Sequence, residues 1–288
     1  MMRLSVQAAR AGDHGLSAQS PRPPDVRTDP RIGHAGGMPL DLNSDLGEGF
    51  GPWRMGDDAA VLDIVTSANI ACGFHAGDPR IMRRTCDLAV ARGVRIGAHV
   101  GYRDLVGFGR RDIAVAPDDL RDETLYQIGA LAAFARAAGD RVRYVKPHGA
   151  LYHAAAADPA LADALLAAVA ESDDEPALLG PAGTELEHAA ARAGVRFVGE
   201  GFADRAYTPA GTLAPRGTPG AVLGPDDAVA QAVSLALSGT ARTVDGPGAV
   251  AVSAGSICVH GDSPAAVEMA RRIRGALAEA GVPVEPFA

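Results

Sequence analysis

The apolar runs of this chain end, one after another, in polar side chains. Such runs end at or next to Asp45, His99, Lys146, Glu200 and His260, although these positions are far apart in the sequence. A strand of a parallel sheet is buried on both faces and should be almost entirely apolar. Because an unpaired ionisable group is costly to bury, polar residues gather where such a strand emerges. Repeated along the chain, this pattern is typical of a βα barrel, which builds one site from many strand ends.

Strands and helices are expected to alternate from residue 39 onward. Apolar runs predict strands near 39–45, 65–71, 94–99, 142–147, 177–180, 195–199 and 250–260. Helical patterns predict helices near 57–65, 78–92, 117–138, 158–171, 183–193, 225–238 and 263–280. Seven such units favour a closed or nearly closed barrel, with a doubly wound open sheet as the alternative. The stretch 201–224 is rich in Gly and Pro and too long for an ordinary βα loop, so we expect a lid or a partner surface there.

Composition excludes several classes of protein. A net charge of -8 and a pI near 5.5 argue against nucleic-acid binding, which needs a basic face. No apolar run approaches the roughly 18–20 residues of a membrane span, so no membrane association is expected. The three cysteines are odd in number and form no CxxC motif, which is typical of a reducing compartment. A soluble, cytoplasmic protein is therefore predicted.

The first 38 residues differ from the rest of the chain. Ser17 to Arg31 is rich in Pro, Arg, Asp and Ser and has no apolar periodicity, so no packed core is expected. No continuous apolar segment follows the early arginines, which weighs against a secretory signal. Residues 1–38 are predicted to be a disordered or non-native extension, the latter if translation begins at Met38, and residues 39–288 a single catalytic barrel domain.

Asp45 and Glu48 form a candidate acid–base pair just after the first strand. Two neighbouring carboxylates can differ in pKa through burial and mutual repulsion, which suits one to act as base and one as acid. The alternative is that Asp45 caps a turn and Glu48 is solvated. His75 follows in a glycine-containing loop that opens a helix, where free backbone N–H groups favour an anion. The nearby Asp78 is the expected cap of that helix.

Later strand ends supply further candidates for catalysis. His99 ends a strand of small residues, and alone it is more typical of a satisfied core histidine than of a catalyst. Lys146 would point into the barrel mouth and could neutralise a carboxylate or phosphate oxygen. His148 could transfer a proton at neutral pH. Glu200 and His260 complete the catalytic candidates at the last two strands.

More charged residues surround the same mouth. Arginine suits bidentate binding of carboxylate or phosphate, although an exposed Arg–Asp pair can equally be a surface salt bridge. Histidine and aspartate from several strands could hold a divalent metal. No HExxH-like spacing supports that, so no metal site is predicted. The candidate substrate or phosphate ligands are Asn43, Arg110, Arg111, Asp204, Arg205 and Asp262.

Seven segments resemble the LamB/YcsF family, and the resemblance covers about residues 39–282. Two residues depart from the family pattern: Ser44 stands where Cys is usual and Val100 where Pro is usual, so a catalytic thiol at position 44 is disfavoured. The segments are Asp41–Glu48 (DLNSDLGE), Asn69–Asp78 (NIACGFHAGD), Gly97–Tyr102 (GAHVGY), Val106–Arg111 (VGFGRR), Val145–Tyr152 (VKPHGALY), Glu200–Tyr207 (EGFADRAY) and Ser256–Asp262 (SICVHGD).

The resemblance implies a (β/α)7 barrel related to the glycoside hydrolase/polysaccharide deacetylase superfamily. The implied activity is that of a 5-oxoprolinase, which opens 5-oxo-L-proline to L-glutamate with ATP, expected as its Mg complex, as co-substrate. The implied partners are separate B and C subunits, and a homo-oligomer is also considered. Two other functions stay open: a stand-alone, metal-dependent amidohydrolase or deacetylase, and a binding subunit without catalysis of its own.

Overall fold

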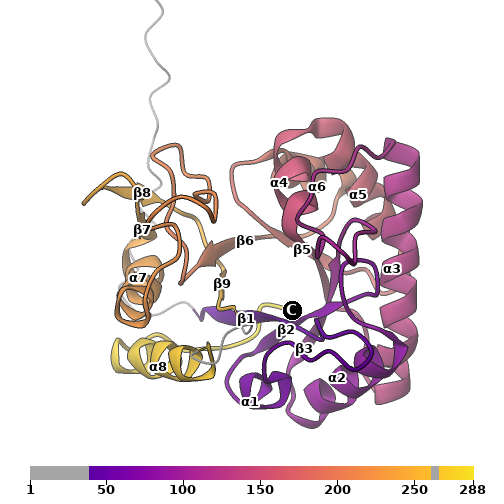
Figure 1. Cartoon of the computed structure of the whole chain (residues 1–288), viewed down its shortest axis with the longest axis horizontal. Coiled ribbons are helices and arrows are strands. Elements are labelled where there is room, and N and C mark those ends of the chain that lie inside the picture. The colour runs from indigo at the N-terminus through magenta and orange to yellow at the C-terminus, as the bar shows by residue number, and fades with distance from the viewer. Residues whose placement is uncertain (1–38, 261–265) are drawn as a thin grey trace, which may run out of the picture. The chain divides into compact units, whose positions relative to one another are not determined.

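Seven parallel strands form a closed barrel in the part of the chain that the computed structural model describes, residues 39–260 and 266–288. The strands are β1 (Asp41–Leu46), β2 (Ser67–Ala71), β3 (Arg95–Val100), β4 (Tyr144–Pro147), β5 (Ala177–Gly180), β6 (Phe197–Phe202) and β9 (Ser256–Cys258). They follow one another around the barrel in this order, and β9 pairs with both β6 and β1 (Figure 1). The predicted closed barrel is confirmed, and the alternative of an open sheet is wrong.

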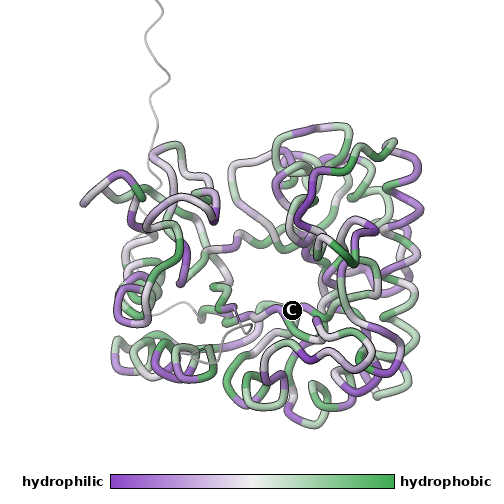
Figure 2. Tube along the Cα trace, viewed as in Figure 1, coloured by the Kyte–Doolittle hydropathy of each residue, from purple (hydrophilic) through white to green (hydrophobic). Residues whose placement is uncertain are grey.

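Helices lie outside the strands in Figure 1. They are α1 (Asp58–Leu62), α2 (Pro79–Ala91), α3 (Pro117–Ala138), α4 (Gly149–Ala157), α5 (Pro159–Glu171), α6 (Glu185–Ala193), α7 (Pro225–Ser238) and α8 (Ala266–Glu279). Hydrophobic and hydrophilic residues alternate along these helices in Figure 2, as expected when one face of a helix packs on the barrel. No single described helix combines the length and apolar composition of a membrane span, although the sharply bent pair α4 and α5 does so jointly.

Local capping explains where several helices begin and end. The Asp78 side chain accepts hydrogen bonds from the backbone N–H groups of Arg80 and Ile81, both at 2.9 Å, and proline occupies the first turn of α2. Asp158 caps α5 in the same way. At the other end of α3, Gly139 adopts a φ of 98°, a left-handed conformation that favours glycine.

The barrel interior is polar, while the layer between barrel and helices is apolar. Asn43 on β1 donates to Ser256 at 2.7 Å and accepts from Asn69 at 2.8 Å, and Asn69 accepts from the Tyr144 hydroxyl at 2.6 Å. These bonds join β9, β1, β2 and β4, so this face of β1 points inward. Leu42, one position along, is fully buried on the opposite face in the apolar core. The alternation lets one strand serve both layers.

The predicted strand at 250–260 is wrong as a single element. Its first part is β8 (Ala249–Ala251), which pairs with β7 (Thr240–Arg242) in a separate antiparallel sheet. Only the second part, β9, enters the barrel. Between them the backbone passes so close to β6 that a Cβ atom on Gly199 would lie 2.2 Å from the Ser253 carbonyl oxygen. The chain turns from one sheet to the other at this close approach.

Three further boundaries differ from the sequence-based expectations. Strand β6 continues to Phe202, beyond the predicted end at residue 199, because the charge of Glu200 is neutralised inside the barrel. Helix α4 was not expected, and α1 is shorter than the predicted helix at 57–65. The N-terminal extension of residues 1–38 and the predicted start of the last helix at residue 263 lie outside the described residues.

Candidate functional site

A cavity of about 340 Å³ lies where the carboxyl ends of the barrel strands meet. It is lined by side chains from β1, β3 and β4 and from the segments after β6 and β9. The structure thus brings together residues that are far apart in the sequence, such as Asp45 and His260, which are 215 positions apart. This arrangement is the one that barrel enzymes use for their sites. The charged and titratable residues that line the cavity are Asp45, Glu48, His99, Arg110, Asp112, Lys146, His148, Tyr152, His153, Arg205, Arg216 and His260.

Lys146 is the only lysine in the sequence, and its ammonium group is buried among carboxylates. Its Nζ atom lies 2.9 Å from Asp45 Oδ1 and 2.8 Å from Glu200 Oε1. Burial favours the neutral amine, but the negative charges of Asp45 and Glu200 outweigh it and hold the pKa of Lys146 well above its usual value. Lys146 is therefore a fixed cation that balances two buried anions.

Asp45 and Glu48 have pKa values shifted in opposite directions. Burial acts to raise the pKa of Asp45, but the charges of His99 and Lys146 outweigh it and hold that pKa well below its usual range. Burial, followed by the nearby charge of Asp45, raises the pKa of Glu48. The two pKa values are thus split as expected for a carboxylate pair, because His99 and Lys146 lie beside Asp45.

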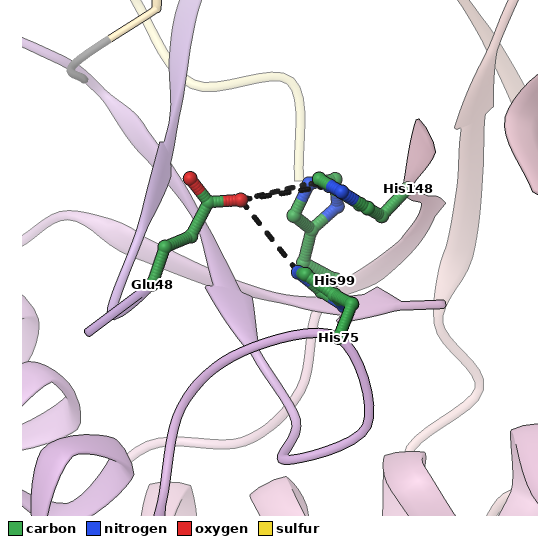
Figure 3. A group of neighbouring side chains, drawn as sticks. All are labelled: Glu48, His75, His99 and His148. Carbon is green, nitrogen blue, oxygen red and sulfur yellow. Dashed lines mark hydrogen bonds and ion pairs between the residues drawn. The ribbon is translucent and has the colours of Figure 1, made fainter. Parts of the chain in front are cut away.

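Three histidines converge on Glu48 (Figure 3). Glu48 Oε1 lies 3.6 Å from His75 Nε2, 3.9 Å from His99 Nε2 and 3.5 Å from His148 Nδ1. The rings of His75 and His148 are stacked with centroids 3.8 Å apart. Burial holds the pKa values of both rings well below the usual histidine value. Four ligand atoms from this group lie within 4.8 Å of one another, close enough to hold one metal ion.

His260 forms a second titratable centre in the cavity, after β9. Its Nδ1 atom lies 2.7 Å from Asp204 Oδ2, and its Nε2 atom lies 2.9 Å from Arg216 Nη2. Burial favours the neutral ring, but the Asp204 carboxylate outweighs it and raises the pKa of His260. Arg216 was missed by sequence reasoning, as was His153; the signal for Arg216 was its place in the Gly/Pro-rich stretch 201–224, which also contributes Leu213 and Pro215 to the cavity.

Two of the remaining candidate residues, Asn43 and Arg205, bind other parts of the protein around the cavity. Asn43 belongs to the polar layer inside the barrel, with Lys146 Nζ 3.4 Å from its Oδ1 atom. Arg205 reaches the cavity, but its guanidinium donates to the carbonyl oxygens of Ala214 and Ala221 and so holds the 201–224 stretch.

The two consecutive arginines after β3 play different parts. Arg110 lines the cavity, and its guanidinium lies 4.8 Å from the centre of the Phe108 ring. Arg111 does not line the cavity and pairs with Asp104 instead, with its side chain 63% exposed. The salt-bridge alternative therefore describes Arg111 better than a ligand-binding role. Asp262, the last candidate, lies outside the described residues.

The two departures from the family motifs lie away from the cavity. Ser44 is fully buried, and its hydroxyl donates to the Val259 carbonyl oxygen at 2.6 Å. It points away from the face that carries Asn43 and Asp45, because successive side chains of a strand alternate. Val100 is also buried, and its carbonyl oxygen accepts from the His148 backbone N–H at 2.8 Å. Neither residue lines the cavity.

The fold and the cavity define the class: a closed (β/α)7 barrel with a cavity of acidic and basic side chains at the carboxyl ends of its strands. Within this class the family model of the LamB/YcsF family matches residues 40–288. The chain belongs to the LamB/YcsF family, and the resemblance noted from its motifs is confirmed.

Close relatives cover nearly all of the described chain. The protein is 76% identical over 250 residues to the A subunit of 5-oxoprolinase from Nocardia farcinica, a match of 87% of this chain and 100% of the relative. It is 57% identical over 250 residues to the corresponding 5-oxoprolinase protein of Streptomyces griseus, covering 86% and 100% respectively. Among solved structures, the lactam utilization protein of Thermus thermophilus superposes with a TM-score of 0.82 at 45% identity, covering 87% of this chain and 100% of that one.

Proposed function

We propose that this chain is the A subunit of an ATP-dependent 5-oxoprolinase, a cytoplasmic enzyme that converts 5-oxo-L-proline to L-glutamate. The single observation that carries the proposal is the full-length likeness to proteins named as the A subunit of 5-oxoprolinase, over a region that includes every strand lining the charged cavity. The cavity is large enough for a five-membered lactam and has cationic and acidic side chains on its walls.

The reaction needs an activated carbonyl and a delivered water. A lactam carbonyl is a poor electrophile, and transfer of the terminal phosphoryl group of ATP, as its Mg complex, to the amide oxygen makes that oxygen a leaving group. ADP leaves in this transfer. A first water then attacks the ring carbon and the carbon–nitrogen bond breaks, which gives an acyl phosphate. A second water hydrolyses the acyl phosphate, and inorganic phosphate and glutamate are released. The departing nitrogen takes up a proton. The protein's part is to place these groups and to stabilise the developing charge.

Cationic side chains are suited to the anionic parts of the substrate. The substrate carboxylate and the transferred phosphate both carry negative charge, and the guanidinium groups of Arg110 and Arg216 line the cavity. Arginine donors match carboxylate and phosphate oxygens in pairs. Lys146 contributes less directly, since its charge is already shared by Asp45 and Glu200. We assign Arg110 and Arg216 to anion binding and Lys146 to holding the carboxylates in place.

The acidic pair and His260 suit the two proton transfers. Asp45 or Glu48 positions or deprotonates the attacking water, since both carboxylates line the cavity. His260 also lines the cavity, and the Asp204 carboxylate beside it favours the protonated ring. Its Nε2 atom can protonate the departing nitrogen once Arg216, now 2.9 Å away, turns to a substrate anion. His99 and His148 are the other candidates for this role, and His99 Nε2 lies 3.0 Å from His148 Nδ1. Each such proton transfer typically contributes about 10²–10⁴-fold to the rate.

Partner subunits are proposed to cover an apolar surface beside the cavity. A second cavity reaches Glu48 and His75 from the side of the β1–α1 and β3–α3 segments. Trp53 is 70% exposed there and Val106 is 92% exposed. An exposed apolar patch of this kind marks a protein–protein contact. Because the relatives are named as subunits, we assign the patch to the 5-oxoprolinase B or C subunit. Its apolar residues are Phe50, Trp53, Met55, Leu105 and Val106.

A second candidate function is a stand-alone, metal-dependent amidohydrolase. The histidine group around Glu48 favours it, because four potential metal ligands meet at the wall of the cavity. The third alternative, a binding subunit without catalysis, would leave the same residues to hold substrate only.

Co-expression distinguishes the three functions. The full chain is purified with candidate B and C subunits and assayed for glutamate formed from 5-oxo-L-proline with and without ATP. The proposal predicts glutamate only when ATP, this chain and its partners are all present. Lactam hydrolysis by this chain alone without ATP would favour the amidohydrolase. Unchanged turnover after the substitutions Asp45→Asn and His260→Gln, with 5-oxo-L-proline still bound, would favour the binding subunit.

A further inference from the structure

We propose that His75, His99, His148 and Glu48 together bind one divalent transition-metal ion, with Zn²⁺ as the best chemical match. The sequence predicted no metal because these residues are not closely spaced along the chain. The inference goes beyond the proposed function, since metal binding by these side chains does not depend on which amide is the substrate. It rests on the geometry of the four ligand atoms, on the tautomers of two rings and on three buried atoms without hydrogen-bond partners, in His75 and Glu48.

The spacing of the four ligand atoms suits a tetrahedral ion. Glu48 Oε1 lies 3.5–3.9 Å from one nitrogen of each histidine. Ligands bound to zinc at roughly 2.0–2.1 Å in a tetrahedron lie roughly 3.3–3.4 Å apart. Three imidazole nitrogens and one carboxylate oxygen are ligands that zinc and its neighbours prefer, whereas Mg²⁺ and Ca²⁺ prefer oxygen alone. The His75 and His148 rings are stacked with centroids 3.8 Å apart, so rotation of one ring would direct both lone pairs at the same ion.

In His99 and His148, the ring nitrogen that faces away from Glu48 is hydrogen-bonded to a backbone carbonyl, and this bond fixes the tautomer of the ring. His99 Nδ1 lies 3.1 Å from the Lys146 carbonyl oxygen, and His148 Nε2 lies 2.8 Å from the Phe108 carbonyl oxygen. A carbonyl can only accept, so in a neutral ring each of these nitrogens carries the hydrogen. Backbone carbonyls orient metal-binding histidines in this way in many proteins.

The facing nitrogens of these rings then need a cation between them. Once the outer nitrogens carry the hydrogens, His99 Nε2 and His148 Nδ1 both present lone pairs, and they are only 3.0 Å apart. Both atoms also face Glu48 Oε1, which as a carboxylate oxygen can only accept. Acceptors facing one another in a buried place repel unless a proton or a metal ion joins them. A metal ion would satisfy all of these lone pairs at once.

His75 supplies an independent observation. Its side chain is buried, and neither ring nitrogen has a hydrogen-bond partner among the described residues. Glu48 Oε1 is buried without a hydrogen-bond partner too. Native proteins leave few buried polar atoms unsatisfied, and such atoms call for an unseen ion or water. In Figure 3 His75 and Glu48 approach the same point, next to the other two rings.

A second group of potential metal ligands lies nearby, but a lysine ammonium beside it makes it unsuitable for a metal ion. Asp45, Cys258 and His260 also come within ligand distance of one another. However, the ammonium of Lys146 lies 2.9 Å from Asp45 Oδ1 and 3.3 Å from Cys258 Sγ. This fixed cation already occupies the position and would repel a second one. The metal is therefore assigned to the histidine group around Glu48.

Titration with metal alone tests the proposal. The tag-free full chain is treated with a chelator and titrated with Co²⁺, followed by visible absorption, and with Zn²⁺, followed by calorimetry. We expect one equivalent to bind and the absorption to have the intensity of four-coordinate cobalt. The variants His75→Gln and Glu48→Gln should each weaken binding at least tenfold. His188→Gln is the matched control, because His188 lies on the exposed face of α6, outside the group.

Two results would overturn the proposal. One is a natively folded chain, judged by circular dichroism, that binds less than a tenth of an equivalent of either metal. The other is equal affinity in the wild type and in a folded His75→Gln or Glu48→Gln variant, which would place the metal elsewhere. Because no lactam, ATP or partner enters the titration, its outcome is separate from that of the glutamate assay.

Discussion

At the scale of single residues, the site depends on one buried cation. Lys146 stands between Asp45 and Glu200, and removal of the ammonium would take away the buried counter-charge that the two carboxylates share, with His99 Nε2 still 3.3 Å from Asp45 Oδ2. Breaking a buried ion pair by removing one partner is far more costly than removing a surface pair. The charge balance inside the barrel therefore links stability and function at the same residue.

Replacement of this lysine tests that link directly. We predict that Lys146→Met lowers the free energy of unfolding by about 3–5 kcal/mol, because two buried carboxylates lose the ammonium group between them. Urea denaturation of the purified chain measures the change. Arg92→Met is the control, since Arg92 forms only a partly exposed pair with Asp63. Equal losses in the two variants would contradict the role given to Lys146.

Asp41 makes the stability of the barrel depend on pH. Burial raises the pKa of its carboxyl from 3.8 to about 6, although the hydroxyls of Ser256, Ser67 and Thr66 donate to it. The folded state thus binds this proton more tightly than the unfolded chain. The resulting stability is complete below about pH 4 and is lost as the pH rises through about 6.

The variant Asp41→Asn isolates this effect. Relative to the variant, the wild type should lose about 3 kcal/mol of unfolding free energy between pH 4 and pH 7, which is about two pKa units. Parallel urea titrations at several pH values measure the difference, and other titrating groups cancel between the two proteins. A difference that stays constant across this range would show that Asp41 titrates normally in the fold.

At the scale of elements, α7 anchors the long segment after β6. Gln231 on α7 donates to the carbonyl oxygens of Phe202 and Arg205, both at 2.7 Å, and accepts from the Arg242 backbone N–H at 2.9 Å. One side chain therefore ties together the end of β6, the 201–224 stretch and β7. That stretch carries Arg216 to the cavity, so its attachment positions part of the site.

Loss of this anchor should loosen the segment without unfolding the barrel. We predict that Gln231→Leu costs about 1–3 kcal/mol, because buried backbone groups lose their partners. Hydrogen exchange should accelerate in residues 203–224 and not in β1 to β5. The variant Leu237→Ala, at an exposed position of the same helix, is the comparison. Acceleration that is equal throughout the barrel strands would contradict the anchoring role.

The sequence predicted the polar ends of the barrel strands correctly, but it did not predict the small β7–β8 sheet. Asp45, His99 and Lys146 interrupt apolar runs, so they could be assigned to one rim before their contacts were known. The hairpin of β7 and β8 was missed because Ala249–Ala251 and Ser256–Cys258 read as one apolar run, and only the close approach at Gly199 separates them. The histidine group was missed for a similar reason, since its members meet only after folding.

At the scale of the whole molecule, the cavity and the apolar patch are adjacent. The patch around Trp53 and Val106 lies over a second cavity that reaches Glu48 and His75, both of which belong to the histidine group. A partner bound there would close one approach to the site and exclude water from it. Assembly and catalysis would then depend on each other, as expected for one component of a multi-chain enzyme.

Charge placed in the patch should separate the subunits. We predict that Trp53→Glu combined with Val106→Glu weakens co-purification with the B and C subunits at least tenfold, because the apolar contact would bury two charges. The free chain should keep its folded circular dichroism spectrum. Leu237→Glu, in an exposed apolar position on α7, is the control. Unchanged co-purification, or loss of self-association instead, would contradict the assignment of the patch to these partners.

The central claim is that side chains from separate strand ends act together on one lactam. The most direct measurement is the rate of ATP-dependent glutamate formation from 5-oxo-L-proline by the assembled complex, with Asp45→Asn compared with wild type and with His188→Gln. The account predicts a loss of about 10²–10⁴-fold for Asp45→Asn with normal assembly of the complex, and no loss for the control. Wild-type turnover by a properly assembled Asp45→Asn enzyme would contradict it.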